Sequence, residues 1–272
     1  MNKKGKTMQE YLNLLIISVL AVGAGVSYVS ARHFQKRLKK VEQANREMIS
    51  NIAHELKTPM TSIIGFVETL QNGAIENPEK ARNFLDIIAI ETSRLHSIID
   101  ETLEISRLDN LKEDVNKTEF IADEAIEETV KSLEPIAAQD NIAISVYYTD
   151  SKPIRVLANK VRIQQIITNI VGNAIKYNQK GGKVDVTISQ VAKNLRIKVY
   201  NTGRGIKNEH IASLFDRFYR VDDGRARDVG GTGLGLAIVK KILQLYGGKI
   251  EVESVPEQSA TFTIFLPICV GY

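Results

Sequence analysis

The sequence is poor in cysteine and in excess charge, and both shortages exclude kinds of site. Cys269 is the single cysteine in 272 residues, so neither an internal disulfide nor a CxxC zinc site is possible. The formal net charge is only +4 and no basic face stands out, so we expect no direct contact with nucleic acid. No internal repeat or low-complexity tract is present. The length predicts about two globular domains.

One run near the N-terminus lacks charge altogether. Leu12 to Val29 is mostly apolar, and its length of about 18 residues approaches the roughly 20 that span a bilayer. We therefore predict a transmembrane helix over residues 12–30, after a short tail of residues 1–11. A signal peptide is the alternative, because lysines precede the run. More Lys and Arg residues follow the run than precede it, which favours a cytoplasmic C-terminal side.

The next segment has apolar residues at alternating steps of four and three. This spacing predicts a heptad seam, and hence a dimeric signalling helix over residues 31–49, although a plain amphipathic helix is the simpler alternative. The helix is expected to continue to about Leu70, with a bend at Pro59. The seam positions are Phe34, Leu38, Val41, Asn45, Met48 and Ile52.

A second long helix is predicted from about Glu79 to Leu108, after turn signals at Asn72-Gly73 and Asn77-Pro78. Together the two helices would form an antiparallel hairpin over residues 50–110. Two such hairpins, one from each of two chains, would make a four-helix bundle.

Beyond a polar linker, Leu111–Lys117, helices alternate with strand-like runs. The pattern predicts an α+β chain in which residues 118–268 form an α/β sandwich with helices on one face of a sheet. The predicted helices lie near Ile121–Ala138 and Lys160–Tyr177. The predicted strands are Ile142–Tyr148, Lys183–Gln190, Leu195–Tyr200, Lys249–Ser254 and Ala260–Leu266.

His54 opens the first of five motifs that carry chemistry, HELKTP at residues 54–59. Imidazole is a nucleophile near neutral pH and can carry a phosphoryl group on a ring nitrogen. Glu55 is placed to accept a ring proton, and a hydroxyl at Thr58, on the same helical face, can orient a water. A lone exposed His is often only solvated. A zinc protease would need a second His where Thr58 stands.

The second motif is Asn169–Asn178, in the second predicted helix of the sandwich. Asn169, Asn173, Lys176 and Tyr177 recur at steps of three and four, which places them on one face. Asn carbonyl oxygens suit Mg²⁺, and a Lys one turn later can balance phosphate charge. The plain alternative is a polar helix face without a ligand.

Three further motifs are rich in glycine or aromatic residues. Asn201–Ile206 (NTGRGI) follows a strand, and its glycines let backbone approach a flat ring. Leu214–Arg220 (LFDRFYR) precedes a polar segment, Asp222–Gly230, that is typical of a mobile lid. Gly231–Leu236 (GTGLGL) opens a helix, where backbone N–H groups suit polyphosphate. No Gly-Lys-Ser/Thr follows, and the motif lies far from the first strand, so it is neither a Walker nor a Rossmann loop.

The order of these five motifs resembles the sensor histidine kinases of two-component systems, over about Arg32 to Pro267. The resemblance implies a dimerisation and phosphotransfer hairpin, followed by an ATP-binding sandwich of the gyrase and Hsp90 type. In chain order, the motifs match that family's phosphoacceptor box, N box, first glycine box, F box and second glycine box.

The resemblance also implies roles for single residues. His54 would accept the γ-phosphoryl group of ATP with Glu55 as base, and Thr58 would serve the reverse phosphatase activity. Asn173, with Asn169 nearby, would hold Mg²⁺. The residues implied in nucleotide binding are Asn169, Asn173, Lys176, Tyr177, Asn201, Gly203, Gly205, Arg217, Arg220, Gly231, Gly233, Leu234, Gly235 and Leu236.

Three features depart from the family pattern. Asn201 stands where Asp usually accepts a hydrogen bond from the adenine amino group; Asn keeps a carbonyl acceptor but adds a competing donor. Asn159 likewise stands where Asp is common. Only about 11 residues precede the predicted span, so we expect no extracellular sensor domain.

We therefore predict a single-pass protein of the cell membrane with a cytoplasmic kinase region. It would act as a homodimer with the receiver domain of a response regulator as partner, and take its input from the span, a membrane partner protein or the seam helix. Two alternatives stay open. Asn201 alone supports a kinase-impaired scaffold or phosphatase. Another ATPase of the gyrase and Hsp90 class is opposed by His54 and the hairpin.

Overall fold

The computed structural model describes residues 32, 34–36, 39, 42–43, 46–149, 153–221 and 231–268. The chain divides into two compact units, with the boundary between His54 and Glu55. The predicted tail and transmembrane helix, several seam positions, the predicted lid segment and Cys269 lie outside the described residues. Within the described ranges, no helix is long and apolar enough to cross a membrane.

Two long helices precede the sheet. Residues 46–71 form one helix, which confirms the predicted continuation past His54 to about Leu70. A short helical turn, η1 (Ala74–Glu76), leads into α2 (Pro78–Asn110). Asn77 caps α2 by accepting a hydrogen bond from the Lys80 N–H, and a proline at the first helical position loses no helical bond. The rings of Phe66 and Phe84, tilted at 33° with centroids 5.2 Å apart, join the two helices.

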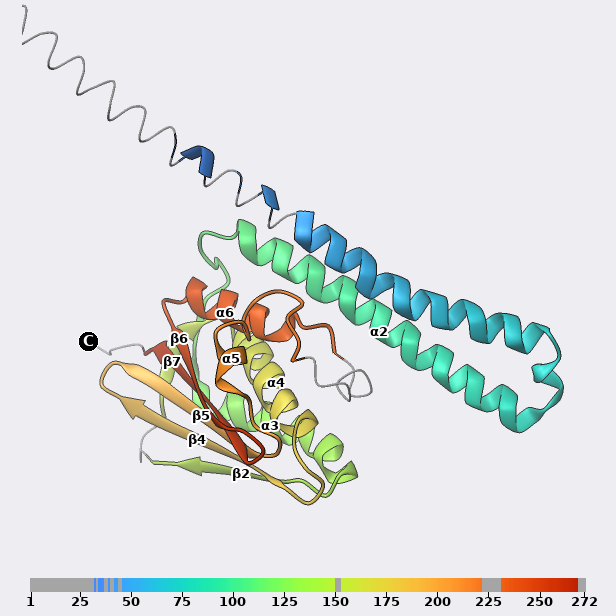
Figure 1. Cartoon of the computed structure of the whole chain (residues 1–272). Coiled ribbons are helices and arrows are strands. Elements are labelled where there is room, and N and C mark those ends of the chain that lie inside the picture. Colours follow the sequence, from blue (N-terminus) through green and yellow to red (C-terminus); the bar gives the residue numbers. More distant parts are fainter. Residues whose placement is uncertain are drawn as a thin grey trace, which may run out of the picture. The chain divides into compact units, whose positions relative to one another are not determined.

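The α/β domain follows, with its helices on one face of a twisted sheet (Figure 1). The five-stranded sheet has the order β2-β4-β5-β7-β6, in which only the β2–β4 pair is parallel, and β1 pairs with β3 separately. The elements are β1 (Thr118–Ile121), α3 (Ala122–Gln139), β2 (Ala143–Tyr148), β3 (Arg155–Ala158), α4 (Lys160–Lys176), β4 (Lys183–Val191), β5 (Asn194–Thr202), α5 (Asn208–Ile211), α6 (Gly235–Leu245), β6 (Lys249–Val255) and β7 (Ser259–Pro267).

The core lies between the sheet and α3, α4 and α6. Alternate residues of β4 and β5, such as Val186 and Ile197, are fully buried, because side chains along a strand point to opposite faces. Helix α4 packs onto them with Ile166, Ile170 and Val171, which are buried as their spacing predicts. Both predicted sandwich helices and all five predicted strands are confirmed. The four-residue strands β1 and β3 were not predicted.

The linker between α2 and β1 is tied to the α/β domain by a buried carboxylate. Asp114 accepts hydrogen bonds from Arg162 Nε, at 2.8 Å, and from the Tyr246 hydroxyl. Arg162 also pairs with Glu104 of α2, at 2.9 Å. Burial alone would raise the pKa of Asp114, but the bonds from Tyr246, the Asn116 N–H and Arg162 lower it. One arginine thus binds both the end of α2 and the linker.

Candidate functional site

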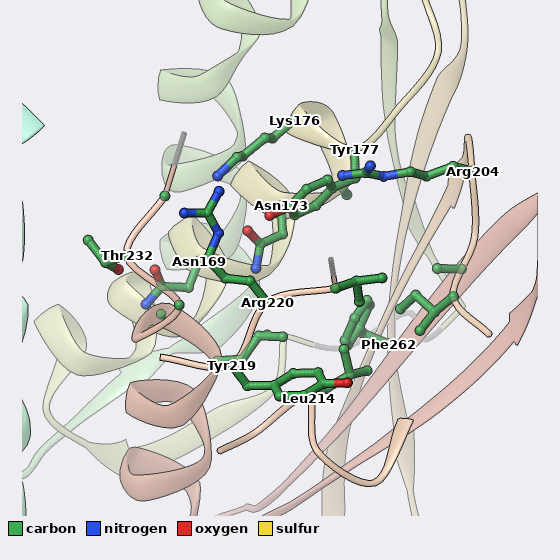
Figure 2. A pocket seen from close by; sticks show the side chains of 18 of the residues that line it. Asn169, Asn173, Lys176, Tyr177, Arg204, Leu214, Tyr219, Arg220, Thr232 and Phe262 are labelled. Atoms are coloured by element: carbon green, nitrogen blue, oxygen red, sulfur yellow. The ribbon is translucent and has the colours of Figure 1, made fainter. Parts of the chain in front are cut away.

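A cavity of about 490 Å³ opens beside α4 and the start of α6, within the size range of small-molecule sites (Figure 2). It is built from segments far apart in the sequence, and four of the five predicted motifs contribute to it. The predicted site residues that line it are Asn169, Asn173, Lys176, Tyr177, Asn201, Gly205, Arg220, Gly231, Gly233, Gly235 and Leu236.

The cavity has two chemically different ends. Figure 2 shows Lys176 and Arg220 with their side-chain nitrogens close together, near the amides of Asn169 and Asn173. Another part of the wall is apolar, with lining residues that include Ile206, Leu214 and Phe262. Such a site suits a ligand with an anionic group at one end and a flat apolar body at the other.

The pKa of Lys176 is lowered by its surroundings at the cationic end of the cavity. Burial, followed by repulsion from Arg220, lowers the pKa of Lys176 to about 8, although Glu101 acts in the opposite direction. Arg204 and Arg94 add to the repulsion. Positive charge therefore accumulates here beyond what Glu101 balances, and an anionic ligand would relieve it.

Tyr177 lines the cavity, and two cationic side chains lie over its ring. The Arg204 guanidinium lies 4.6 Å from the ring centroid, and Lys176 Nζ lies 5.1 Å from it. Gly203, at φ 136°, makes this packing possible, because a Cβ there would lie 2.4 Å from the Tyr177 carbonyl oxygen. Gly203 does not line the cavity, but it holds the first glycine segment against Tyr177. Arg204 was not predicted, although it stands between the two glycines of that motif.

Gly233 has a comparable role in the second glycine segment. Its φ is 73°, and a Cβ there would come within 2.8 Å of the Phe218 backbone. The Phe218 N–H donates to the Gly233 carbonyl at 3.0 Å. The aromatic motif and the glycine motif are thereby joined on either side of residues 222–230. Leu234, which follows, is fully buried as the residue before α6 and does not line the cavity.

Asn201 lies at the end of β5 and is 4% exposed. Its Nδ2 donates to the Thr202 carbonyl at 2.7 Å. One of the two N–H donors that distinguish Asn from Asp is therefore used within the chain, and the side-chain carbonyl oxygen is an acceptor in Asn as in Asp. The position where the family usually has Asp is therefore filled by a buried Asn that still carries an acceptor oxygen.

The HELKTP motif lies on the helix of residues 46–71, where His54 and Thr58 are both exposed. Glu55 is partly buried, and its Oε2 lies 3.5 Å from Arg94 Nη2 of α2. Glu55, the predicted base beside His54, is thus paired with Arg94, which the sequence did not predict.

Two family models match the chain, and they match it in the order of its two structural regions. The His Kinase A (phospho-acceptor) domain matches residues 44–111. The histidine kinase-, DNA gyrase B- and HSP90-like ATPase matches residues 158–269. The chain belongs to the sensor histidine kinases of two-component systems.

Individual relatives agree. The chain is 32% identical over 251 residues to the sensor protein kinase WalK of Staphylococcus aureus, which covers 92% of this chain and 60% of that protein. It resembles the histidine kinase ThkA, solved in complex with the response regulator protein TrrA, with 30% identity and a TM-score of 0.66 over 81% of this chain and 61% of that one. Full-length ShkA, in complex with AMPPNP, gives 25% identity and a TM-score of 0.61 over 82% of this chain and 46% of that one.

One residue that was predicted to bind nucleotide lies outside the cavity. Arg217 does not line the cavity; its Nη2 donates to Oδ2 of Asp109 on α2, and Lys241 Nζ lies 2.8 Å from the other carboxylate oxygen. The F box therefore contributes Leu214, Tyr219 and Arg220 to the cavity, but not Arg217.

The sequence did not predict that α2 lines the cavity. The residues concerned lie on one face of α2, and Glu101 among them accepts a hydrogen bond from the Thr232 hydroxyl. Burial raises the pKa of Glu101, against the effects of that bond and of Lys176. Their spacing of three and four residues identifies a helix face, but only the folded structure shows what the face contacts. They are Ile90, Ser93, Arg94, Ser97 and Glu101.

Proposed function

We propose that this chain is an ATP-dependent protein-histidine kinase that phosphorylates His54 and passes the phosphoryl group to an aspartate of a response regulator. The observation that carries the proposal is the two-ended cavity, cationic at Lys176 and Arg220 and apolar at Leu214 and Phe262. A protein that binds ATP in this cavity and carries an exposed His on a separate helix has both halves of a phosphotransfer reaction.

The cavity fits ATP part by part. The apolar wall, with Ile206, Leu214 and Phe262, would take the adenine ring. Asn201 would accept a hydrogen bond from the adenine amino group through its side-chain carbonyl oxygen, while its Nδ2 donates to the Thr202 carbonyl. Lys176 would pair with the phosphates, and their charge would restore the protonated state that burial and neighbouring cations disfavour.

Mg²⁺ would be held by Asn173, with Asn169 one turn earlier on α4. Both amides line the cavity near its cationic end (Figure 2). The described residues contain no cluster of three or more His, Cys, Asp or Glu side chains, so the remaining ligands would be phosphate oxygens and water. The ion would supply neutralisation of the charge that develops on the phosphates during transfer.

The chemistry itself is a displacement at phosphorus. A ring nitrogen of His54 would attack the γ-phosphorus, the new N–P bond would form, and the bond to the β–γ bridging oxygen would break to release ADP. Glu55 would accept the proton from the other ring nitrogen. Thr58 would orient a water when the reaction runs as a phosphatase on the partner.

The assembly would be a membrane-anchored homodimer. The proposed divisions are residues 1–11 (tail), 12–30 (transmembrane helix), 31–49 (signalling helix), 50–110 (hairpin) and 118–268 (ATP-binding domain). The complex of the relative ThkA with its response regulator supports a receiver domain as partner. We place the chain in the cell membrane with the kinase region in the cytoplasm, and a membrane partner protein or the span itself would bring the signal.

A labelling experiment tests the proposal. The full chain, in membranes or detergent, is incubated with γ-labelled ATP and Mg²⁺ beside an Asn201→Asp variant. We expect label that is lost in acid and stable in base, as a phosphoramidate is, in both proteins. Label in Asn201→Asp alone would show that the parent chain is a scaffold or phosphatase. Absence of label from both would overturn the kinase assignment.

A further inference from the structure

The side of the cavity formed by α2 carries a cation whose contacts are incomplete. Arg94 lines the cavity beside Ile90, Ser93 and Ser97, and its charge is one of those that lower the pKa of Lys176. Its side chain is 23% exposed, and its Nε is buried without a hydrogen-bond partner. A buried N–H of a guanidinium is normally paired, so this donor indicates a ligand group that belongs beside it.

The same guanidinium has a second connection. Arg94 Nη2 lies 3.5 Å from Oε2 of Glu55, whose side chain is 22% exposed. Glu55 directly follows His54 in the sequence. One side chain therefore contacts the neighbour of the phosphoacceptor and also lines the cavity at its cationic end.

We infer that Arg94 binds the terminal phosphate of the nucleotide and, through the same guanidinium, couples the filled site to Glu55. The inference rests on the proposed function and assigns a hairpin residue to its phosphate site. A guanidinium offers five donors in a planar fork, so it can hold a carboxylate on one edge and a phosphate oxygen on another. A nucleoside diphosphate would lack the γ-phosphate that Arg94 binds.

Two consequences follow for binding. Removing Arg94 weakens triphosphate more than diphosphate, because only the triphosphate reaches the guanidinium. Removing the charge of Glu55 strengthens triphosphate binding, because Arg94 is then no longer neutralised. The second effect depends on Arg94 and vanishes in its absence, which a purely structural ion pair between the two helices would not produce.

The test measures the dissociation constants of ATP and ADP, with Mg²⁺, for the full chain and its variants by calorimetry. In Arg94→Ala we expect an ATP dissociation constant about 10-fold higher and an ADP constant within roughly twofold of the parent. Arg94→Lys should recover part of the preference for ATP. Arg107→Ala is the matched control, since Arg107 is also on α2, has an exposed side chain, and does not line the cavity.

The Glu55 arm uses a double-mutant cycle. Glu55→Gln should bind ATP about three-fold more tightly than the parent, and Arg94→Ala/Glu55→Gln should bind it as Arg94→Ala does. Asp100→Asn, which removes one exposed acid of α2, should change neither constant. Thermal melting of every variant controls for loss of folding.

The outcomes separate this inference from the function beneath it. A parent chain that binds neither nucleotide would overturn the proposed function and, with it, the role of Arg94. A parent that binds ATP while Arg94→Ala keeps the parent's ratio of ATP to ADP affinity would overturn the inference alone. A Glu55→Gln effect that persists without Arg94 would overturn the coupling.

Discussion

The α/β domain and the hairpin use their apolar residues differently. In the domain, the sheet and helices fully bury the large aliphatic side chains of the faces that pack together, as Ile166 and Ile197 illustrate. On α2, by contrast, Leu85, Ile99 and Leu103 are 57%, 43% and 49% exposed. A domain that completes its own core can fold alone, whereas an amphipathic helix pair with an apolar face in water needs another layer. The comparison supports a hairpin completed by a second chain.

The contacts between α2 and the α/β domain are polar, unlike the buried core of the domain and the exposed apolar face of α2. Glu101 meets Thr232, Glu104 meets Arg162, and Asp109 meets Arg217 and Lys241. Polar contacts of this type resemble those of interfaces that open and close, rather than those of a core. The α/β domain should therefore tolerate their loss better than the loss of a buried isoleucine.

The largest expected effect comes from the domain core. Ile170→Ala should lower the free energy of unfolding of the α/β domain by about 2–5 kcal/mol, because a fully buried isoleucine leaves a cavity in a packed interior. Denaturant unfolding measures the loss, and sedimentation should still find the proposed hairpin dimer. A change below about 0.5 kcal/mol would mean that α4 is not part of the core.

A substitution on the exposed apolar face of the hairpin should weaken the proposed dimer and leave the stability of the α/β domain unchanged. Leu103→Asp should weaken the proposed dimer by about 2–3 kcal/mol, since it removes an apolar contact and buries a charge. The melting of the α/β domain should not change. Analytical ultracentrifugation tests the first statement, with Asp100→Asn as control. A dimer of parental affinity would place the partner surface elsewhere.

The polar contact at Asp109 should matter least for stability. Asp109→Asn should cost less than about 1 kcal/mol, as is usual for partly exposed ion pairs. Burial opposes ionisation, but hydrogen bonds from Lys241 and Arg217 lower the pKa of Asp109, so the pair contributes above the ordinary Asp range and is lost as the pH falls. Amide exchange of the segment around Arg217 should rise in the variant; unchanged exchange would contradict the contact.

The smallest expected effect is the uptake of part of a proton by Lys176 when nucleotide binds. Lys176 of the nucleotide-free protein has a pKa of about 8, and bound phosphate would raise it, so binding at a pH of about 8.5 should take up part of a proton. Calorimetry in two buffers of different ionisation enthalpy measures this uptake. Lys176→Arg, whose guanidinium stays charged, should show none. Equal uptake in both proteins would remove Lys176 from the phosphate site.

The sequence predicted the long periodic elements because burial imposes a period on their apolar residues, as with Ile166, Ile170 and Val171. It did not predict β1 and β3, which are too short to show a period, or the residues of α2 that line the cavity. The faces that α2 presents to other elements depend on tertiary packing. The sequence likewise gave no sign that Arg217 would pair with Asp109, because both partners are equally plausible as solvated charges.

The measurement that tests the central claim most directly uses His54→Gln, assayed for ATP binding and for labelling from γ-labelled ATP in the same preparation. In the proposed function, the α/β domain holds the nucleotide and the hairpin accepts its phosphoryl group. We predict that the variant binds ATP with the parent's dissociation constant and carries no acid-labile label. Label that persists in His54→Gln would place the phosphoacceptor elsewhere and contradict the account.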